Sequence, residues 1–156
     1  VLVDDLLARG GEAAVDEVLR TPPTTSEQVI LPAKLAAGER AVAVETPPAG
    51  AEAIDEGVFG MLMVQVLLGD VIGDDAAHVA AVGWAGDRYV AWDTPDGATC
   101  VRIHLHYDTP SDVLDLLWGF EAYTEEVPHV TAQLVDPLTV EVNGCANSAA
   151  SGGSSL

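Results

Sequence analysis

Along the first twenty residues, apolar side chains recur at the spacing of an α-helix. Residues 2–9 and 12–20 each place them on one face, which predicts two helices. Gly10 and Gly11 separate the two segments and should break the helical run. Pro22 follows the second segment, so we expect the helix to end before it.

Beyond this proline the pattern predicts shorter elements. Thr24 and Glu27 have the spacing of a capping box, so a short helical turn should begin here. Pro32 interrupts that turn, because proline lacks the N–H that an interior helical position needs. Residues 41–53 are expected to be extended and then to form a loop.

The middle of the chain is its most apolar part. Residues 55–69 are apolar on nearly every side, begin with two acidic residues and end at a glycine, which predicts a buried helix. The most apolar stretch within it, residues 58–68, is too short to span a bilayer. Residues 74–82 predict a shorter helix.

The pattern then changes to one that predicts strands. Residues 88–93 and 98–107 are rich in Tyr, Val, Trp and Ile, and Pro-Asp-Gly lies between them. A proline-containing turn between two such runs is typical of a β-hairpin. Residues 138–142 predict a last strand, and we expect the Asn-Gly pair that follows to turn the chain out of it.

Residues 110–126 carry the strongest helical pattern. Thr109 is positioned to cap the helix, Pro110 suits its first turn, and Asp112 adds an acidic group there. Apolar residues then follow at helical spacing as far as Tyr123.

Together these elements predict an α+β fold. A helical N-terminal half precedes a small antiparallel sheet, formed by a hairpin at about 88–107 and a strand at about 138–142, and the sheet packs with the helix at about 110–126. We expect residues 1–145 to form a single domain and residues 146–156, rich in Gly, Ser and Ala, to form a flexible tail.

Composition narrows the range of partners. Hydrophobic residues make up 49% of the 156 residues, which is ample for a core. The formal net charge is −19, and after Arg102 the chain has eight acidic residues and no Lys or Arg. Such a chain repels phosphate, so binding to nucleic acid or to an anionic membrane surface is not expected. Cationic partners, metal ions or simple solubility remain as explanations of the charge.

Cys100 and Cys145 are the two cysteines of the chain. Their spacing does not match a zinc motif. Cys100 lies in a predicted strand and Cys145 follows another, so a disulfide is reasonable if these strands are neighbours, and free thiols are the alternative. A disulfide would stabilise the fold if the compartment is oxidising.

Few residues suggest chemistry within this chain. It contains no His-Glu-x-x-His, Gly-x-Ser-x-Gly or Walker motif. His104 and His106 alternate along one predicted strand and therefore face the same side, where they could share a metal ion. The sequence does not identify a third ligand, and two histidines on a solvated strand explain the pattern equally well. We therefore predict no metal or catalytic site in these residues.

The stretch GWAGDRYVAWDT, residues 83–94, concentrates aromatic residues in a chain that is otherwise poor in them. Trp84, flanked by glycines, could pack over the start of a strand. Asp87-Arg88 at the strand's start could form a charge-assisted pair or bind a loop carbonyl. A structural role is favoured over a ligand-binding role.

Three blocks of sequence resemble a known family. They are PPTTSEQVILPAKLAAGE at residues 22–39, VGWAGDRYVAWDT at 82–94, and YDTPSDVLDLLWGFEAY at 107–123. In this order they resemble bacterial zinc-metallopeptidase-like proteins of the actinobacterial type, many of them secreted or lipid-anchored. The resemblance covers roughly residues 1–126.

The resemblance also implies where chemistry would lie. The family's His-Glu-x-x-His helix precedes the region that this chain resembles, so zinc and the catalytic groups would belong to an upstream domain. The chain begins without methionine and in a helical pattern, which fits the C-terminal part of a longer protein. Leu31, Ala33 and Leu35 replace the His, Glu and Tyr of the family pattern. The family-motif positions that remain are Glu27, Gln28, Pro32, Lys34, Trp84, Asp87 and Arg88.

Three functions follow as hypotheses. The first is a non-catalytic C-terminal domain of a secreted or cell-envelope metallopeptidase-like protein, which supports an upstream zinc site. The second is an acidic extracytoplasmic interaction module or accessory subunit that binds an envelope protein. The third is an acidic inhibitor or nucleic-acid mimic, which would bind a basic partner in a salt-sensitive manner.

Overall fold

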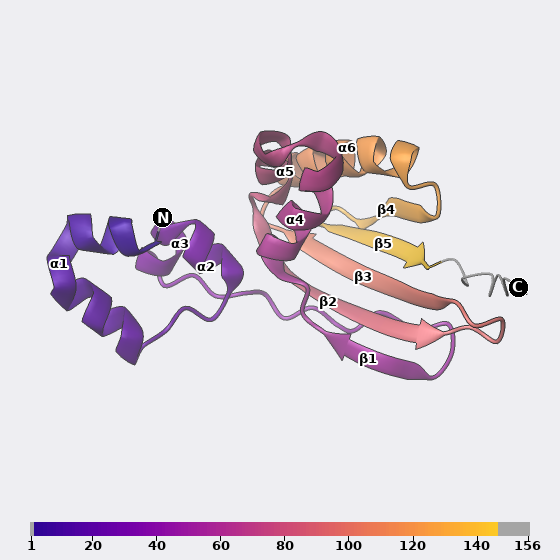
Figure 1. Cartoon of the computed structure of the whole chain (residues 1–156), viewed down its shortest axis with the longest axis horizontal. Coiled ribbons are helices and arrows are strands. Elements are labelled where there is room, and N and C mark those ends of the chain that lie inside the picture. The colour runs from indigo at the N-terminus through magenta and orange to yellow at the C-terminus, as the bar shows by residue number, and fades with distance from the viewer. Residues whose placement is uncertain (1, 147–156) are drawn as a thin grey trace, which may run out of the picture.

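The structure, a computed structural model, describes residues 2–146 and contains a five-stranded antiparallel sheet (Figure 1). The strands lie in the order β1-β2-β3-β5-β4, so β1 and β4 form its edges. Their bounds are Ala53–Gly57 (β1), Trp84–Asp93 (β2), Thr99–Tyr107 (β3), Val130–Asp136 (β4) and Thr139–Cys145 (β5).

Helices occupy one side of this sheet and the N-terminal end of the chain. Helices α4, α5 and α6 cover one face of the sheet, whereas α1, α2 and α3 lie beside it (Figure 1). Their bounds are Leu2–Arg20 (α1), Ser26–Ile30 (α2), Pro32–Ala36 (α3), Gly60–Ile72 (α4), Asp74–Ala81 (α5) and Pro110–Glu126 (α6). The predicted α+β class, with a helical N-terminal part followed by a sheet, is confirmed.

The main core lies between the sheet and α4–α6. Alternate residues of β3 and β5 point into it, and the apolar faces of the three helices cover them. Its buried side chains are Met61, Val64, Leu68, Ala77, Ala80, Ala81, Trp84, Ile103, Leu105, Tyr107, Val113, Leu116, Phe120, Val140 and Val142.

The opposite face of the sheet, called here the outer face, is crossed by the extended segment 41–50. The N–H of Val42 donates to the carbonyl of Ala85 at 2.7 Å. A Cβ on Gly86 would overlap the carbonyl oxygen of Val42, so only glycine permits this close approach. Further along, Arg102 donates from Nη1 to the carbonyl of Pro48 at 2.7 Å. The segment is therefore bonded to the sheet near both of its ends.

A disulfide joins Cys100 and Cys145 on this outer face, which confirms the predicted bridge. The two residues lie directly opposite each other on β3 and β5, with a Cα–Cα distance of 3.9 Å. Cys100 packs with Val90 and Trp92 in a second, smaller buried cluster. Val90 and Trp92 thus serve this cluster and not the main core.

Several helical predictions are confirmed. Thr109 caps α6, since its hydroxyl accepts a hydrogen bond from the N–H of Asp112, and Pro110 is the first helical residue. In α1, Gly11 has φ of 63° and breaks the helix where the glycine pair predicted a break. One predicted cap is wrong: the short turn before Pro32 is capped by Thr25 and not by Thr24, because the Thr25 hydroxyl accepts from the N–H of Gln28.

The structure corrects three predicted boundaries and adds a strand that was not predicted. Residues 53–57 form edge strand β1, so the predicted helix 55–69 begins only at Gly60. Strand β2 begins at Trp84 instead of residue 88. The last strand, predicted at 138–142, continues through Asn143 and Gly144 instead of turning there. Strand β4 was not predicted, because most of its side chains are exposed and give no buried alternation.

Two further predictions concern a membrane-spanning segment and the C-terminal tail. Among residues 2–146, no helix is both long and apolar enough to cross a bilayer. The predicted tail, 146–156, lies outside the described residues except for Ala146.

Replacing both cysteines with alanine should lower the free energy of unfolding by about 3–4 kcal/mol, because the bridge spans 45 residues and restricts the unfolded chain. Urea titration of the oxidised wild type and the double variant measures the difference. Reductant should destabilise the wild type by a similar amount and leave the double variant unchanged. Equal stability of the two oxidised proteins would contradict the prediction.

Candidate functional site

Lys34 lies at the joint between the N-terminal helices and the sheet. It belongs to α3, and its ammonium contacts three carboxylates, which come from α2, from the segment after α3 and from the end of β3. Nζ lies 2.7 Å from Oδ2 of Asp108 and 3.5 Å from Oε1 of Glu27, and it also donates a hydrogen bond to Glu39. We call these four residues the lysine cluster.

Burial makes the lysine cluster electrostatically unusual. The side chain of Glu27 is only 5% exposed, and its Oε1 accepts no hydrogen bond. This burial raises the pKa of Glu27, although the nearby Lys34 acts in the opposite direction. Burial alone would lower the pKa of Lys34, but its hydrogen bonds to Asp108 and Glu39 outweigh that effect and raise it. Lys34 therefore remains a cation at physiological pH.

Glu27, Glu39 and Asp108 are also the only described residues that could form a three-ligand metal site. Each offers one carboxylate oxygen, and these atoms lie within 4.8 Å of one another. The Lys34 ammonium already contacts all three groups, so it supplies the positive charge that a metal ion would otherwise bring. Sequence reasoning recognised Glu27 and Lys34 but missed Glu39 and Asp108 as their neighbours.

Asp87 has a structural role at the start of α4. Its carboxylate accepts hydrogen bonds at 2.6 Å from the backbone N–H groups of both Phe59 and Gly60, and at 2.7 Å from Nε1 of Trp84. Two backbone donors that begin the helix are thereby satisfied. Burial raises the pKa of Asp87 even though these three donors favour the charged form. Among the described residues Asp87 and Arg88 form no direct ion pair, although the charge of Arg88 also favours the charged form of Asp87.

Gln28 and Pro32 complete the local structure around the lysine cluster. Oε1 of Gln28 accepts from the N–H of Thr24 at 2.7 Å, and Nε2 donates to the carbonyl of Glu39. This bridges α2 to the segment that carries Glu39. Pro32 is the first residue of α3, a position where its missing N–H has no cost.

Arg88 lies apart from the lysine cluster, on the outer face. It lines a hollow of about 210 Å³ together with Trp84, Asp87 and the start of segment 41–50. The seven family-motif positions therefore fall into three places: the joint, the start of α4 and the outer face.

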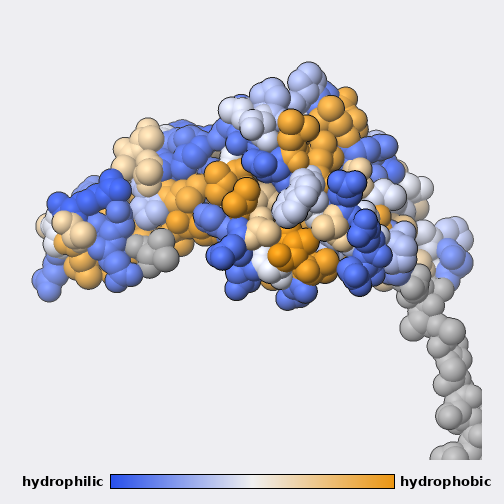
Figure 2. All heavy atoms as spheres, turned by 90° about the horizontal axis from the view of Figure 1, so that it is seen from above, coloured by the Kyte–Doolittle hydropathy of each residue, from blue (hydrophilic) through white to orange (hydrophobic). Residues whose placement is uncertain are grey.

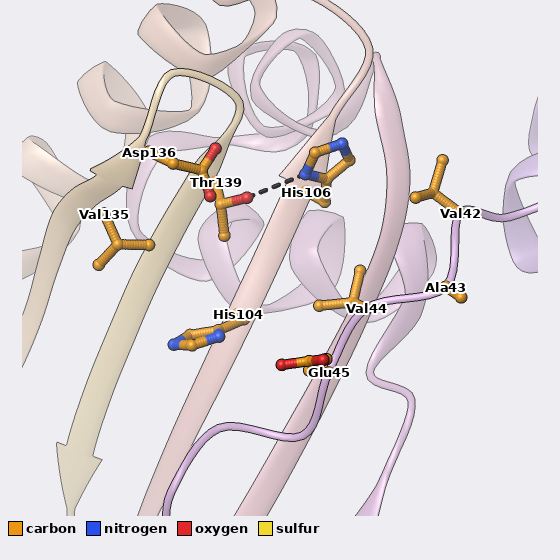
Figure 3. A pocket seen from close by; sticks show the side chains of 9 residues that line it. All are labelled: Val42, Ala43, Val44, Glu45, His104, His106, Val135, Asp136 and Thr139. Atoms are coloured by element: carbon orange, nitrogen blue, oxygen red, sulfur yellow. Dashed lines mark hydrogen bonds between the residues drawn. The ribbon is translucent and has the colours of Figure 1, made fainter.

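A second hollow, of about 330 Å³, lies on the outer face between segment 41–50 and the end of the sheet (Figure 3). Figure 3 shows His104 and His106 side by side along β3, with Glu45 approaching from segment 41–50 and Asp136 from the end of β4. Backbone hydrogen bonds, above all from Leu138, hold the pKa of Asp136 below its usual range.

The two histidines face the same side, as predicted, but each has a separate protein partner. Nε2 of His104 lies 3.1 Å from Oε2 of Glu141, and Nδ1 of His106 lies 2.9 Å from the hydroxyl of Thr139. Among residues 2–146, neither ring belongs to a group of three ligand atoms close enough together to hold a metal ion. The outer face thus carries paired polar side chains across β3 and β5.

No family model, curated protein or solved structure matches this chain. The resemblance to zinc-metallopeptidase-like proteins therefore stays a prediction.

Lys34→Met should lower the free energy of unfolding by about 2–3 kcal/mol. This lies between the values typical of exposed and of fully buried ion pairs, because Lys34 is 23% exposed and Glu27 would lose its countercharge. Arg20→Met is the matched control, since Arg20 pairs with Glu17 on the surface, and it should cost less than about 1 kcal/mol. Urea titration measures both, and similar losses for the two variants would count against the lysine cluster.

The raised pKa of Glu27 predicts a pH dependence. The folded protein binds a proton at Glu27 more readily than the unfolded chain does. Protonation of Glu27 therefore stabilises the folded protein, fully below the ordinary pKa of 4.5. This stabilisation is lost as the pH rises through the pKa that Glu27 has in the folded protein. Wild type should therefore gain stability relative to Glu27→Gln when the pH falls from neutral towards 4.5. Urea titrations at both ends of this range give the difference, and a constant or shrinking difference would refute it.

Proposed function

We propose that this chain is a non-catalytic domain of a secreted or cell-envelope metallopeptidase-like protein, in which it supports a zinc site carried by an upstream domain. In that protein it would position another domain and would not take part in the chemistry. The lysine cluster attaches the N-terminal helices to the sheet, so that a domain preceding α1 is positioned against the body.

The support for this proposal is the way the family-motif residues are used. Glu27, Gln28 and Lys34 form bonds within the joint, and Asp87 accepts three hydrogen bonds at the start of α4. A general base or nucleophile needs a polar atom directed towards a substrate. These residues instead direct their polar atoms at other parts of the chain.

The disulfide supports an extracytoplasmic location. Disulfides persist in oxidising compartments and are rare in the reducing cytosol. The bridge also lies on the outer face, where it joins two strands of the sheet next to the small cluster around Trp92. A domain that works outside the cytoplasm would benefit from this constraint.

The alternative proposal is an accessory interaction module without any upstream zinc site. Apolar side chains that remain exposed on the helices favour it. On α1, Val3, Leu7 and Leu19 are 54%, 47% and 75% exposed, and α1 has no buried residue. Exposed apolar groups of this kind are typical of surfaces that bind another protein.

The supporting role makes a prediction about the gene and the protein that it encodes. A His-Glu-x-x-His helix should be encoded in frame ahead of these residues. In the protein that contains it, Lys34→Met should lower hydrolysis of fluorescein-labelled casein several-fold while the zinc content per chain stays unchanged, because the cleft loses its support. Arg20→Met is the control and should leave the activity unchanged.

Two results would contradict this proposal. A gene without the zinc motif would favour the accessory module instead. Full peptidase activity in a Lys34→Met protein whose stability has fallen would show that the joint does not support the zinc site.

A further inference from the structure

An apolar groove lies on the helical side of the molecule, outside the site described above. Two hollows of about 450 Å³ and 310 Å³ share Phe59 and Met63. The larger hollow extends between α4 and the end of α6, and the smaller one extends towards Tyr89 and Val101 of the sheet. In Figure 2, which views the body from the side of α4–α6, hydrophobic side chains reach its surface.

The walls of this groove are apolar and open to solvent. Val58, Met63 and Val66 are 58%, 45% and 52% exposed, although all three line one of the hollows. Leu62, next to Met63 on α4, is also 48% exposed. Large exposed apolar side chains that cluster in this way mark binding surfaces, and methionine adapts to partners of varied shape.

Negative groups gather at the far end of the groove. The last turns of both α4 and α6 reach the larger hollow, through Asp70 and Val71 on one side and Tyr123 and Val127 on the other. Neither last turn contains a basic residue, so no cationic side chain of these turns offsets the partial negative charge at the two helix ends. Asp70 adds a full negative charge. Burial and this charge together raise the pKa of Tyr123.

A cation would be favoured at this end of the groove, and an apolar group along the rest of it. A positive group near a helix C-terminus is stabilising, whereas a negative group there is unfavourable. Asp70 and the acidic residues at the end of α6 are such negative groups. The chain itself supplies no Lys or Arg after Arg102. The two hollows share Phe59 and Met63, and their other lining residues lie at opposite ends, near Asp70 and near Tyr89. An extended chain can contact both hollows, which a compact ligand would not.

We propose that this groove binds a segment of a partner polypeptide that presents apolar side chains beside a Lys or Arg. The apolar side chains occupy the two hollows, and the basic side chain lies near Asp70, between the ends of α4 and α6. This inference goes beyond the proposed function, because it requires no upstream zinc site.

The experiment uses a phage-displayed random dodecapeptide library selected on the immobilised, disulfide-bonded chain. Peptides from the enriched pool are synthesised, labelled and tested by fluorescence anisotropy. The enriched sequences should pair Lys or Arg with Leu, Ile, Phe or Met. Binding should weaken several-fold between about 0.05 and 0.5 M salt, because the Debye length falls over this range.

Two pairs of matched variants place the peptide. Asp70→Asn and Val66→Ser should each weaken binding about tenfold, the effect of losing roughly 1.4 kcal/mol. Asp115→Asn on α6 and Val79→Ser on α5 remove the same groups from exposed positions that do not line the groove, and they should change binding less than about twofold. All four positions are exposed, so the variants should fold, and circular dichroism checks this.

Three outcomes would overturn the inference. The library could show no enrichment, the enriched pool could lack basic residues, or its binding could be unaffected by Asp70→Asn and Val66→Ser. A cationic detergent monomer that binds as tightly as the peptides, with the same sensitivity to the variants, would assign the groove to amphiphiles instead. None of these results depends on an upstream zinc motif, so failure here is distinguishable from failure of the proposed function.

Discussion

The contact between the Lys34 ammonium and its three carboxylates is the interaction on which this account depends. It brings together an α3 side chain and the end of β3, which are 74 residues apart in the sequence. Glu27 is buried beside this cation, and without it the charge of Glu27 would have no compensation. Because α1 has no buried residue, the attachment of the N-terminal helices depends on α2, α3 and this cluster.

The remaining polar groups of the family-motif positions mostly stabilise the fold. Asp87 satisfies the first donors of α4, and this fixes the helix that forms one wall of the apolar groove. On the other side of the sheet, segment 41–50 and the disulfide restrain the outer face. The structure therefore combines a stabilised sheet with an apolar surface that is left uncovered beside α4.

Elements with local signals were predictable from the sequence, whereas those that depend on distant neighbours were not. Thr109 and the proline after it mark the start of α6 within a few residues, and the break at Gly11 needs no tertiary information. Edge strands β1 and β4 expose most of their side chains, so they lack the alternation that marks a strand. For the site, the motif pointed to Glu27 and Lys34, but only the fold could reveal Asp108 as their neighbour.

The most direct test of the central claim is the coupling energy between Lys34 and Asp108. It is obtained from the free energies of unfolding of the wild type, Lys34→Met, Asp108→Asn and the double variant. If the ammonium attaches α3 to the end of β3, each single substitution already breaks this contact. The double variant should then lose less stability than the two single variants lose together, by at least about 1 kcal/mol. Simple additivity of the two substitutions would contradict the account.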